Sequence, residues 1–260
     1  MKIELKNVSL NIPIYDNFSI TQSFFNIFKQ KVFNKKITKS SVGGNIVIKE
    51  KKKYVNVINN LSLTLNSGDS IGVIGHNGSG KSSLLKLIAG IYKPYYGEVK
   101  TKGKIFSLFS SNIGMDVDLT GIENIILKCK MNGIDQKQTN NIMDDVISFC
   151  DIGEFINMPI RTYSSGMVIR LSYALTTAFD YEIILIDENL DAGDKFFQEK
   201  MANRNDKFYN KVKILVMVTH NLEKIKKFCN KCMIMQKGKM VMIGKCDDVI
   251  RKYERNDYGY

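Results

Sequence analysis

The stretch GHNGSGKS at residues 75–82 decides the fold, because it fits the phosphate-binding pattern G-x-x-x-x-G-K-[ST]. The apolar run IGVI (71–74) before it predicts a short buried strand, and KSSLLKLIA (81–89) after it has helical apolar spacing. A strand, a glycine turn and a helix start direct several backbone N–H groups and the positive end of a helix dipole toward one point. That point suits the phosphates of a nucleotide.

Two side chains of the loop have the chemistry of a bound nucleoside triphosphate. Lys81 is expected to neutralise the β- and γ-phosphates, and the hydroxyl of Ser82 is expected to bind Mg²⁺. We interpret His76 as a tolerated variable position and not as a catalyst. The predicted nucleotide contacts of this segment are Gly75, His76, Asn77, Gly78, Ser79, Gly80, Lys81, Ser82 and Ser83.

The run IILIDE (183–188) is apolar throughout and ends in two carboxylates. Such a run is typical of a central parallel strand buried on both faces, and open α/β sheets bind their ligands at the carboxyl ends of such strands. Taken alone, it is more simply a strand followed by a solvated acidic turn. The upstream loop favours the functional interpretation, in which Asp187 holds Mg²⁺ and Glu188 polarises the attacking water as a general base.

A second buried strand, ILVMV (214–218), leads to His220 in the same way. The chain has only two histidines, so neither a histidine metal cluster nor a Ser/His/Asp triad is well supported. A single histidine is usually structural, but at this position His220 is predicted to sense the γ-phosphate and to orient the water and Glu188.

The run YSSGM (163–167) begins another helix with apolar periodicity. Ser164, Ser165 and Gly166 at a helix start form a further anion-binding site. One chain would then carry two phosphate-binding helix ends. This predicts two subunits that enclose each nucleotide between them.

These motifs, in this order, resemble the nucleotide-binding subunit of an ABC transporter over roughly residues 1–250. YSSGM stands at the signature motif, so the resemblance implies that Ser164 and Gly166 contact the γ-phosphate held by a partner subunit. Asp194 stands in the D-loop. The implied fold is α/β: a P-loop, largely parallel sheet, an antiparallel edge sheet and a helical subdomain inserted at about 108–180. The resemblance also implies ATP and Mg²⁺ as cofactors, a homodimer, and separate integral membrane permease subunits.

The runs at 107–125, 161–167 and 187–200 are similar to the branch that exports polysaccharides, and the opening residues most resemble O-antigen exporters. The implied function is ATP hydrolysis that drives a lipid-linked polysaccharide across the cytoplasmic membrane. Export of capsule or teichoic acid is an alternative. A soluble ABC ATPase that acts on ribosomes or DNA is a more distant one, since such proteins join two nucleotide-binding units or carry long coiled coils.

Three features of the sequence depart from the family pattern or fit it loosely. Ser110 stands where the family has its Q-loop glutamine, and its shorter hydroxyl would need a bridging water. The chain ends at Tyr260, so we expect no C-terminal carbohydrate-binding domain. Tyr54 is the nearest candidate to stack on adenine, although packing on the sheet would explain this tyrosine equally well; Tyr15 is a weaker candidate.

Composition indicates an ordinary globular chain of 260 residues, with 44% hydrophobic and 25% charged residues. No apolar run reaches bilayer length and no signal peptide is apparent, so we expect the protein to stay in the cytoplasm. The resemblance to exporters implies that it lies peripherally on the cytoplasmic face of the inner (cell) membrane. The net charge is +12, and residues 1–53 supply +8 of it through eleven lysines against three acidic residues.

Within the basic insertion (20–53), residues 20–36 mix aromatics and lysines at helical spacing, which predicts an amphipathic helix on the membrane surface. A solvated charge run is an equally weighted alternative. Charge alone would also fit nucleic acid, but no recognition motif supports that partner.

Strands alternate with helices along the chain, which indicates one α/β domain over residues 1–260. Val55–Leu65 alternates as a half-exposed strand, whereas Ile122–Met131 and Ile142–Phe149 have helical periodicity.

Of five cysteines, Cys229 and Cys232 form a lone C-x-x-C that no second pair completes as a zinc site. The polar tail at 250–260 is expected to fray.

Overall fold

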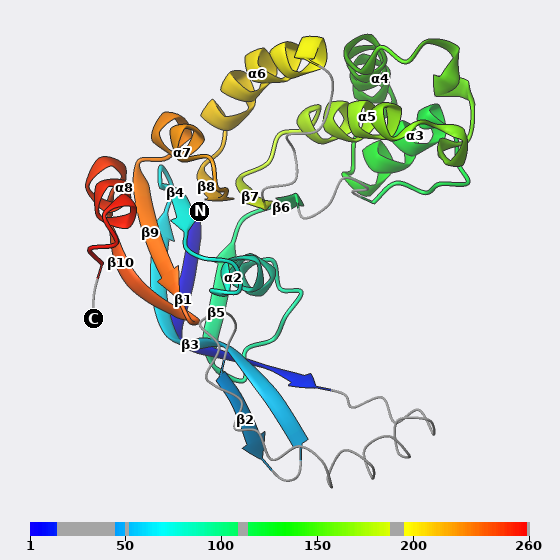
Figure 1. Cartoon of the computed structure of the whole chain (residues 1–260). Coiled ribbons are helices and arrows are strands. Elements are labelled where there is room, and N and C mark those ends of the chain that lie inside the picture. The colour runs from blue at the N-terminus through cyan, green and yellow to red at the C-terminus, as the bar shows by residue number, and fades with distance from the viewer. Residues whose placement is uncertain (15–44, 50–51, 109–113, 188–194, 259–260) are drawn as a thin grey trace, which may run out of the picture.

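The computed structural model describes residues 1–14, 45–49, 52–108, 114–187 and 195–258, which form two sheets and the helices around them (Figure 1). The smaller sheet is antiparallel, in the order β2-β3-β1-β5: β1 is Lys2–Ile14, β2 Asn45–Lys49, β3 Lys52–Asn66 and β5 Tyr96–Lys102. The larger has the order β10-β9-β4-β8-β7-β6: β4 is Ser70–Ile74, β6 Ile105–Leu108, β7 Ile183–Asp187, β8 Ile214–Val218, β9 Lys231–Gln236 and β10 Lys239–Lys245.

The larger sheet is parallel except at β10, which pairs antiparallel with β9. Its central strands are apolar on both faces. In β7, Ile183 and Leu185 belong to the hydrophobic cluster shared with the antiparallel sheet, whereas Ile184 and Ile186 point into the opposite cluster. The continuous apolar run in the sequence is explained by this double burial, and the predicted fold class is confirmed.

Helix α2 (Lys81–Ile88) lies in the core between the two sheets (Figure 1). Leu84, Leu85 and Ile88 are fully or almost fully buried there, in a cluster that also contains residues of β1 and β3 from one sheet and of β7 and β8 from the other. The first residue of α2 is therefore fixed at the carboxyl edge of the parallel sheet by packing on both sides.

Between β6 and β7 the described chain is helical: α3 is Gly121–Met131, α4 Gln136–Cys150 and α5 Ser165–Thr177, with short 3₁₀ turns at Gly153–Asn157 and Ile160–Thr162. Thr120 and Glu123 form a capping box at the start of α3, and Asp135 caps α4. The two helices predicted in this segment are confirmed. Figure 1 shows the group to one side of the sheets, away from β2.

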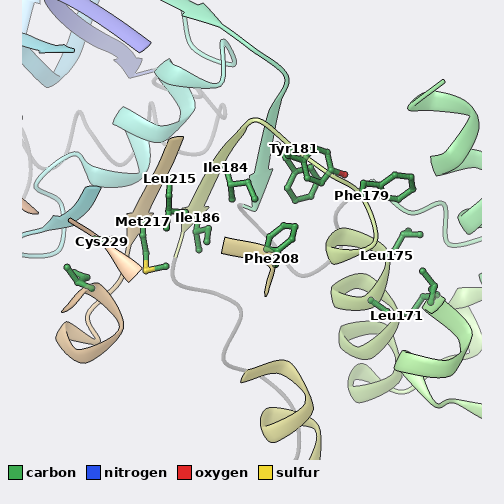
Figure 2. Packing of buried hydrophobic residues seen from close by; sticks show 14 of the residues in the cluster. Leu171, Leu175, Phe179, Tyr181, Ile184, Ile186, Phe208, Leu215, Met217 and Cys229 are labelled. Atoms are coloured by element: carbon green, nitrogen blue, oxygen red, sulfur yellow. The ribbon is translucent and has the colours of Figure 1, made fainter. Parts of the chain in front are cut away.

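Three further helices complete the described chain: α6 (Lys195–Asn210), α7 (Leu222–Phe228) and α8 (Cys246–Glu254). On this face of the parallel sheet, Phe208 of α6 belongs to the same buried cluster as Ile184 and Ile186 of β7 and as Leu171 and Leu175 of α5 (Figure 2). The cluster thereby joins the parallel sheet to the helices inserted after β6.

The expectation that the tail frays after Ile250 is wrong as far as Glu254, where α8 ends. Val249 and Ile250 are buried, so α8 has an apolar face and continues to Glu254. Beyond the helix, the ring of Tyr258 stacks on that of Tyr253 with centroids 5.4 Å apart. Among the described residues, none of the helices combines the length and the hydropathy needed to cross a bilayer.

Candidate functional site

The loop at 75–82 joins β4 to α2 in a conformation that depends on its glycines. Gly75, Gly78 and Gly80 have φ values of +147°, +76° and +103°, in the region that favours glycine. A Cβ on Gly75 would lie 2.2 Å from the carbonyl oxygen of Met235, and one on Gly80 would lie 2.8 Å from that of Val57. The backbone of β9 and β3 thus encloses the loop too closely for any side chain at these two positions.

Lys81 turns its side chain back over the loop. Its Nζ donates to the carbonyl oxygens of Gly75, at 2.7 Å, and His76, at 3.1 Å, and the residue is only 7% exposed. Gly80 occupies the N-cap position of α2 without a side-chain cap, and the first turn of the helix contains no acidic residue. The positive end of the helix and a fixed ammonium therefore lie together, which is the electrostatic requirement of a phosphate site.

An open cavity of about 300 Å³ lies beside this loop, at the start of α2 and the carboxyl ends of β7 and β8. It is lined by Val57, Asn77, Gly78, Gly80, Lys81, Ser82, Ser83, Asp187, Val218 and His220. Asp187 ends β7 and pairs in register with Val218, the last residue of β8. The parallel register brings the aspartate and, two residues after Val218, His220 to the same edge as Lys81 and Ser82.

This arrangement fits the expected cofactors. A glycine cradle, an ammonium and a helix N-terminus suit phosphates. The Ser82 hydroxyl and the Asp187 carboxylate are hard oxygen donors on one cavity, as Mg²⁺ prefers. Among the described residues no group of three or more His, Cys, Asp and Glu could hold a metal ion.

Ser164 is the N-cap of α5, and its Oγ accepts a hydrogen bond from the backbone N–H of Met167 at 3.3 Å. Ser164 and Ser165 are exposed and do not line the cavity at Lys81. A Cβ on Gly166 would meet only Ser164 Oγ, at 3.9 Å. Within one chain, this second helix start faces open space, and the structure does not bring it to the phosphate loop.

Other predicted positions fall elsewhere. Tyr54 lies on β3, half-buried, and is not among the described residues that line the cavity. Ser110, Glu188 and Asp194 lie outside the described residues, as does most of the basic insertion.

Two features of the site were missed in the sequence. Val57 lines the cavity from a bulge in β3, where Leu10 pairs with Ile58 and Asn11 with Asn56, leaving Val57 as an extra residue. The alternation over Val55–Leu65 predicted this strand but gave no sign of the bulge.

The second missed feature is a contact between the C-terminal segment and the loop. Tyr258 Oη lies 3.4 Å from Nε2 of His76, and the ring of Tyr253 lies 6.2 Å from the imidazole. His76 therefore lies against the C-terminal segment and does not line the cavity. No local sequence signal connects residues this far apart.

Together with the sheet order, this geometry defines a class: a P-loop nucleotide-binding protein. The family model described as "ABC transporter" matches residues 58–191. The chain belongs to the ABC transporter family, which confirms the resemblance drawn from its motifs.

Curated relatives support the same branch of the family. The chain is 38% identical to the O-antigen export system ATP-binding protein RfbE of Yersinia enterocolitica, over 90% of this chain and 93% of that protein. It is 37% identical to the teichoic acids export ATP-binding protein TagH of Staphylococcus saprophyticus, over 82% of this chain and 81% of that protein. It matches the O-antigen export protein RfbB of Myxococcus xanthus at 38%, over 76% of this chain but 46% of that longer protein.

Two solved structures share the fold. The ATP-binding subunit of an ABC transporter superimposes with a TM-score of 0.70 at 17% identity, covering 100% of this chain and 95% of that one. A dimeric ATP-binding cassette in a post-hydrolysis state, bound to ADP and phosphate, superimposes with a TM-score of 0.65 at 20% identity. The match covers 94% of this chain and 98% of that one.

Proposed function

We propose that this chain is the ATP-hydrolysing subunit of an exporter that moves a lipid-linked polysaccharide across the cytoplasmic membrane. The observation that supports hydrolysis is the single cavity on which Lys81, Ser82, Asp187 and His220 meet. The similarity to RfbE over nearly the whole of both chains supports the export of an O-antigen-like glycan.

In the proposed reaction, water attacks the γ-phosphate of ATP and ADP leaves. Lys81 holds the terminal phosphates and stabilises the negative charge that develops on their oxygens. Glu188, directly after Asp187 in the sequence, accepts the proton of the attacking water. His220 donates a hydrogen bond to the γ-phosphate from the end of β8. Bound Mg²⁺, held by Ser82 and Asp187, would neutralise charge on the β- and γ-oxygens.

The cavity at Lys81 is open, and the exposed start of α5 carries the other predicted phosphate contacts. We therefore propose a head-to-tail homodimer in which Ser164, Ser165 and Gly166 of one subunit complete the site of the other, with Asp194 near the junction. The dimeric cassette of similar fold supports this arrangement. Stacking of adenine on Tyr54 and coupling through Ser110 are the remaining parts of the proposal.

We propose that this dimer lies at the cytoplasmic face of the membrane, bound to separate permease subunits, with the basic insertion (20–53) on the lipid surface. The +8 charge of residues 1–53 supports the last contact, since anionic lipids attract lysines by about 1 kcal/mol each. Co-purification with an integral membrane protein after mild detergent extraction tests this arrangement. Co-purification with RNA alone would contradict it.

Glu188→Gln in the native host tests the cargo. We expect lipid-linked glycan to accumulate inside the cell and to disappear from its surface. An unchanged amount of glycan on the cell surface, with the variant expressed and no redundant exporter present, would refute polysaccharide export.

The similarity to TagH favours teichoic acid as the second candidate cargo. The accumulated polymer separates the two: a chain linked by phosphodiesters indicates teichoic acid, and a chain of glycosidic bonds alone indicates an O-antigen-like glycan.

A further inference from the structure

The contact between the C-terminal segment and the phosphate loop is made by the side chain of one loop residue, His76. Its Nε2 lies 3.4 Å from Tyr258 Oη, and its ring centroid lies 6.2 Å from that of Tyr253. His76 is exposed and does not line the nucleotide cavity. The imidazole therefore contacts the end of the chain, while the rest of the loop borders the cavity.

The helix that carries this segment is firmly anchored. Helix α8 packs on β9 and β10, beside which it lies in Figure 1, and Val249 and Ile250 are buried in the core. At the start of the helix, the Cys246 thiol donates to the carbonyl oxygen of Cys229 at 3.0 Å. The end of α8 is therefore fixed relative to the larger sheet, whose strand β4 leads into the phosphate loop.

The way in which α8 ends determines the position of Tyr258. Asn256 has a left-handed conformation with a φ of +53°, and its N–H donates to the carbonyl oxygen of Tyr253 at 3.1 Å. The N–H of Asp257 donates to the carbonyl oxygen of Lys252 at 2.9 Å. These two bonds form a Schellman motif, which ends a helix and satisfies its last carbonyl groups. The ring of Tyr258 then stacks on that of Tyr253, with centroids 5.4 Å apart.

The hydroxyl of Tyr258 is oriented by a second partner. It donates to Oδ1 of Asn256 at 3.4 Å. A phenol has a single hydrogen to donate, so toward His76 the same oxygen is the acceptor and Nε2–H of the imidazole is the donor. This pairing requires His76 to carry a hydrogen on Nε2.

The backbone of His76 belongs to the part of the loop that holds Lys81. Its carbonyl oxygen accepts hydrogen bonds from Nζ of Lys81 and from the backbone N–H of Ser79, both at 3.1 Å. Gly75 and Gly78 flank this part of the loop, and glycine restricts the backbone least of all residues. The position of the carbonyl, and with it that of the Lys81 ammonium, therefore depends on what holds the side chain of His76.

We propose that Tyr258 is a positioning residue of the nucleotide site, which acts through His76 on the Lys81 ammonium. The hydroxyl restrains the imidazole, and the imidazole restrains the loop backbone. The carbonyl of His76 then keeps Lys81 in place before the phosphates arrive. Such preorganisation raises affinity because less freedom is lost on binding. This role rests on the proposed function in one respect, the identity of ATP as the ligand.

The test is a double-mutant cycle on nucleotide affinity, measured by titration calorimetry of the full chain with a non-hydrolysable ATP analogue. Tyr258→Phe keeps the ring and removes the hydroxyl, and His76→Ala removes the imidazole. Because each variant loses one hydrogen bond that restrains the loop, each should bind about two- to tenfold more weakly than the wild type. The double variant should lose no more than the larger single loss, because the two groups act through one contact.

The matched control is Tyr96→Phe, at an exposed tyrosine of β5 that does not line the cavity, and it should bind as the wild type does. Wild-type affinity in Tyr258→Phe would overturn the proposal, and so would additive losses in the double variant. A role of Tyr258 in stability alone would lower the melting temperature of Tyr258→Phe and leave the affinity of the folded protein unchanged.

Lys81→Ala separates failure of this positioning role from failure of the proposed function. A strong loss of affinity in Lys81→Ala, with wild-type affinity in Tyr258→Phe, would overturn the role of Tyr258 and leave the ATP site in place. Wild-type affinity in both variants would overturn the role and the ATP site together.

Discussion

The ammonium of Lys81 donates to the carbonyl oxygen of Gly75, 2.7 Å away, so the last part of the phosphate loop is tied to its first residue. The bond closes the loop around the volume that the phosphates are expected to occupy. It also fixes the lysine before a ligand arrives, so little side-chain entropy is lost on binding.

Lys81→Ala should therefore weaken ATP binding strongly. Charge-assisted hydrogen bonds contribute about 1.5–3 kcal/mol, which corresponds to a loss of affinity of roughly 10- to 150-fold. Titration calorimetry with a non-hydrolysable ATP analogue measures this loss of affinity. Lys86→Ala, on the same helix but outside the cavity, is the control. Equal affinity in the two variants would contradict the assignment of Lys81.

The glycines of the loop give a separate prediction about stability. Gly75→Ala places a Cβ 2.2 Å from the Met235 carbonyl at a φ of +147°, whereas Gly90→Ala, at +75°, meets nothing within 4 Å. Both variants incur backbone strain of about 1–3 kcal/mol, but only the first also displaces β9. Denaturant unfolding should show Gly75→Ala as clearly the less stable. An equal loss of unfolding free energy in the two variants would mean that β9 moves aside without an energetic cost.

Much of this site was predictable because its signals are local. Glycines at fixed spacing, apolar runs and the polar residues that end them place Lys81, Asp187 and His220 on one sheet edge. The Val57 bulge, the Met235 carbonyl behind Gly75 and the contact of Tyr258 with His76 depend on tertiary packing between distant residues. The tail was wrongly expected to fray because polar composition concealed the apolar face that Val249 and Ile250 give to α8.

Glu188→Gln tests the general base, a position that only the sequence supplies. The amide keeps the size of the side chain but cannot accept a proton, so turnover should fall about 100-fold or more. ATP binding should persist, and a stable dimer should accumulate because closure is no longer released by hydrolysis. Phosphate release and size-exclusion chromatography with ATP measure the two effects. Near-normal turnover would remove Glu188 from this role.

The cysteines provide a prediction that depends on pH. Burial, with a smaller contribution from nearby Cys246, raises the pKa of Cys232 to about 12. The folded state therefore keeps this thiol protonated above the pH at which an unfolded thiol ionises, near 8.5. Stability should decline as pH rises above that value, because only the unfolded state then loses the proton.

Alkylation at pH 8, read by mass spectrometry, checks this prediction. Cys232 is fully buried, and we expect it to react with iodoacetamide only after denaturation. Rapid labelling of the native protein would show that the region around β9 opens readily.

Gly166 gives the sharpest test of the dimer. A Cβ at this position would meet only Ser164 Oγ, at 3.9 Å, so Gly166→Asp should fold with little loss of stability. In the proposed dimer the same position faces the γ-phosphate bound by the partner subunit, and a carboxylate there repels that phosphate.

We expect ATP binding by the Gly166→Asp monomer to remain, while ATP-induced dimerisation and turnover are lost. Gly133→Asp, at a glycine where an added Cβ would meet nothing within 4 Å, is the control for an added charge. Analytical ultracentrifugation with ATP, in the Glu188→Gln background that retains the dimer, separates the outcomes. A dimer of unchanged affinity in Gly166→Asp would show that the start of α5 does not face the nucleotide of a second subunit.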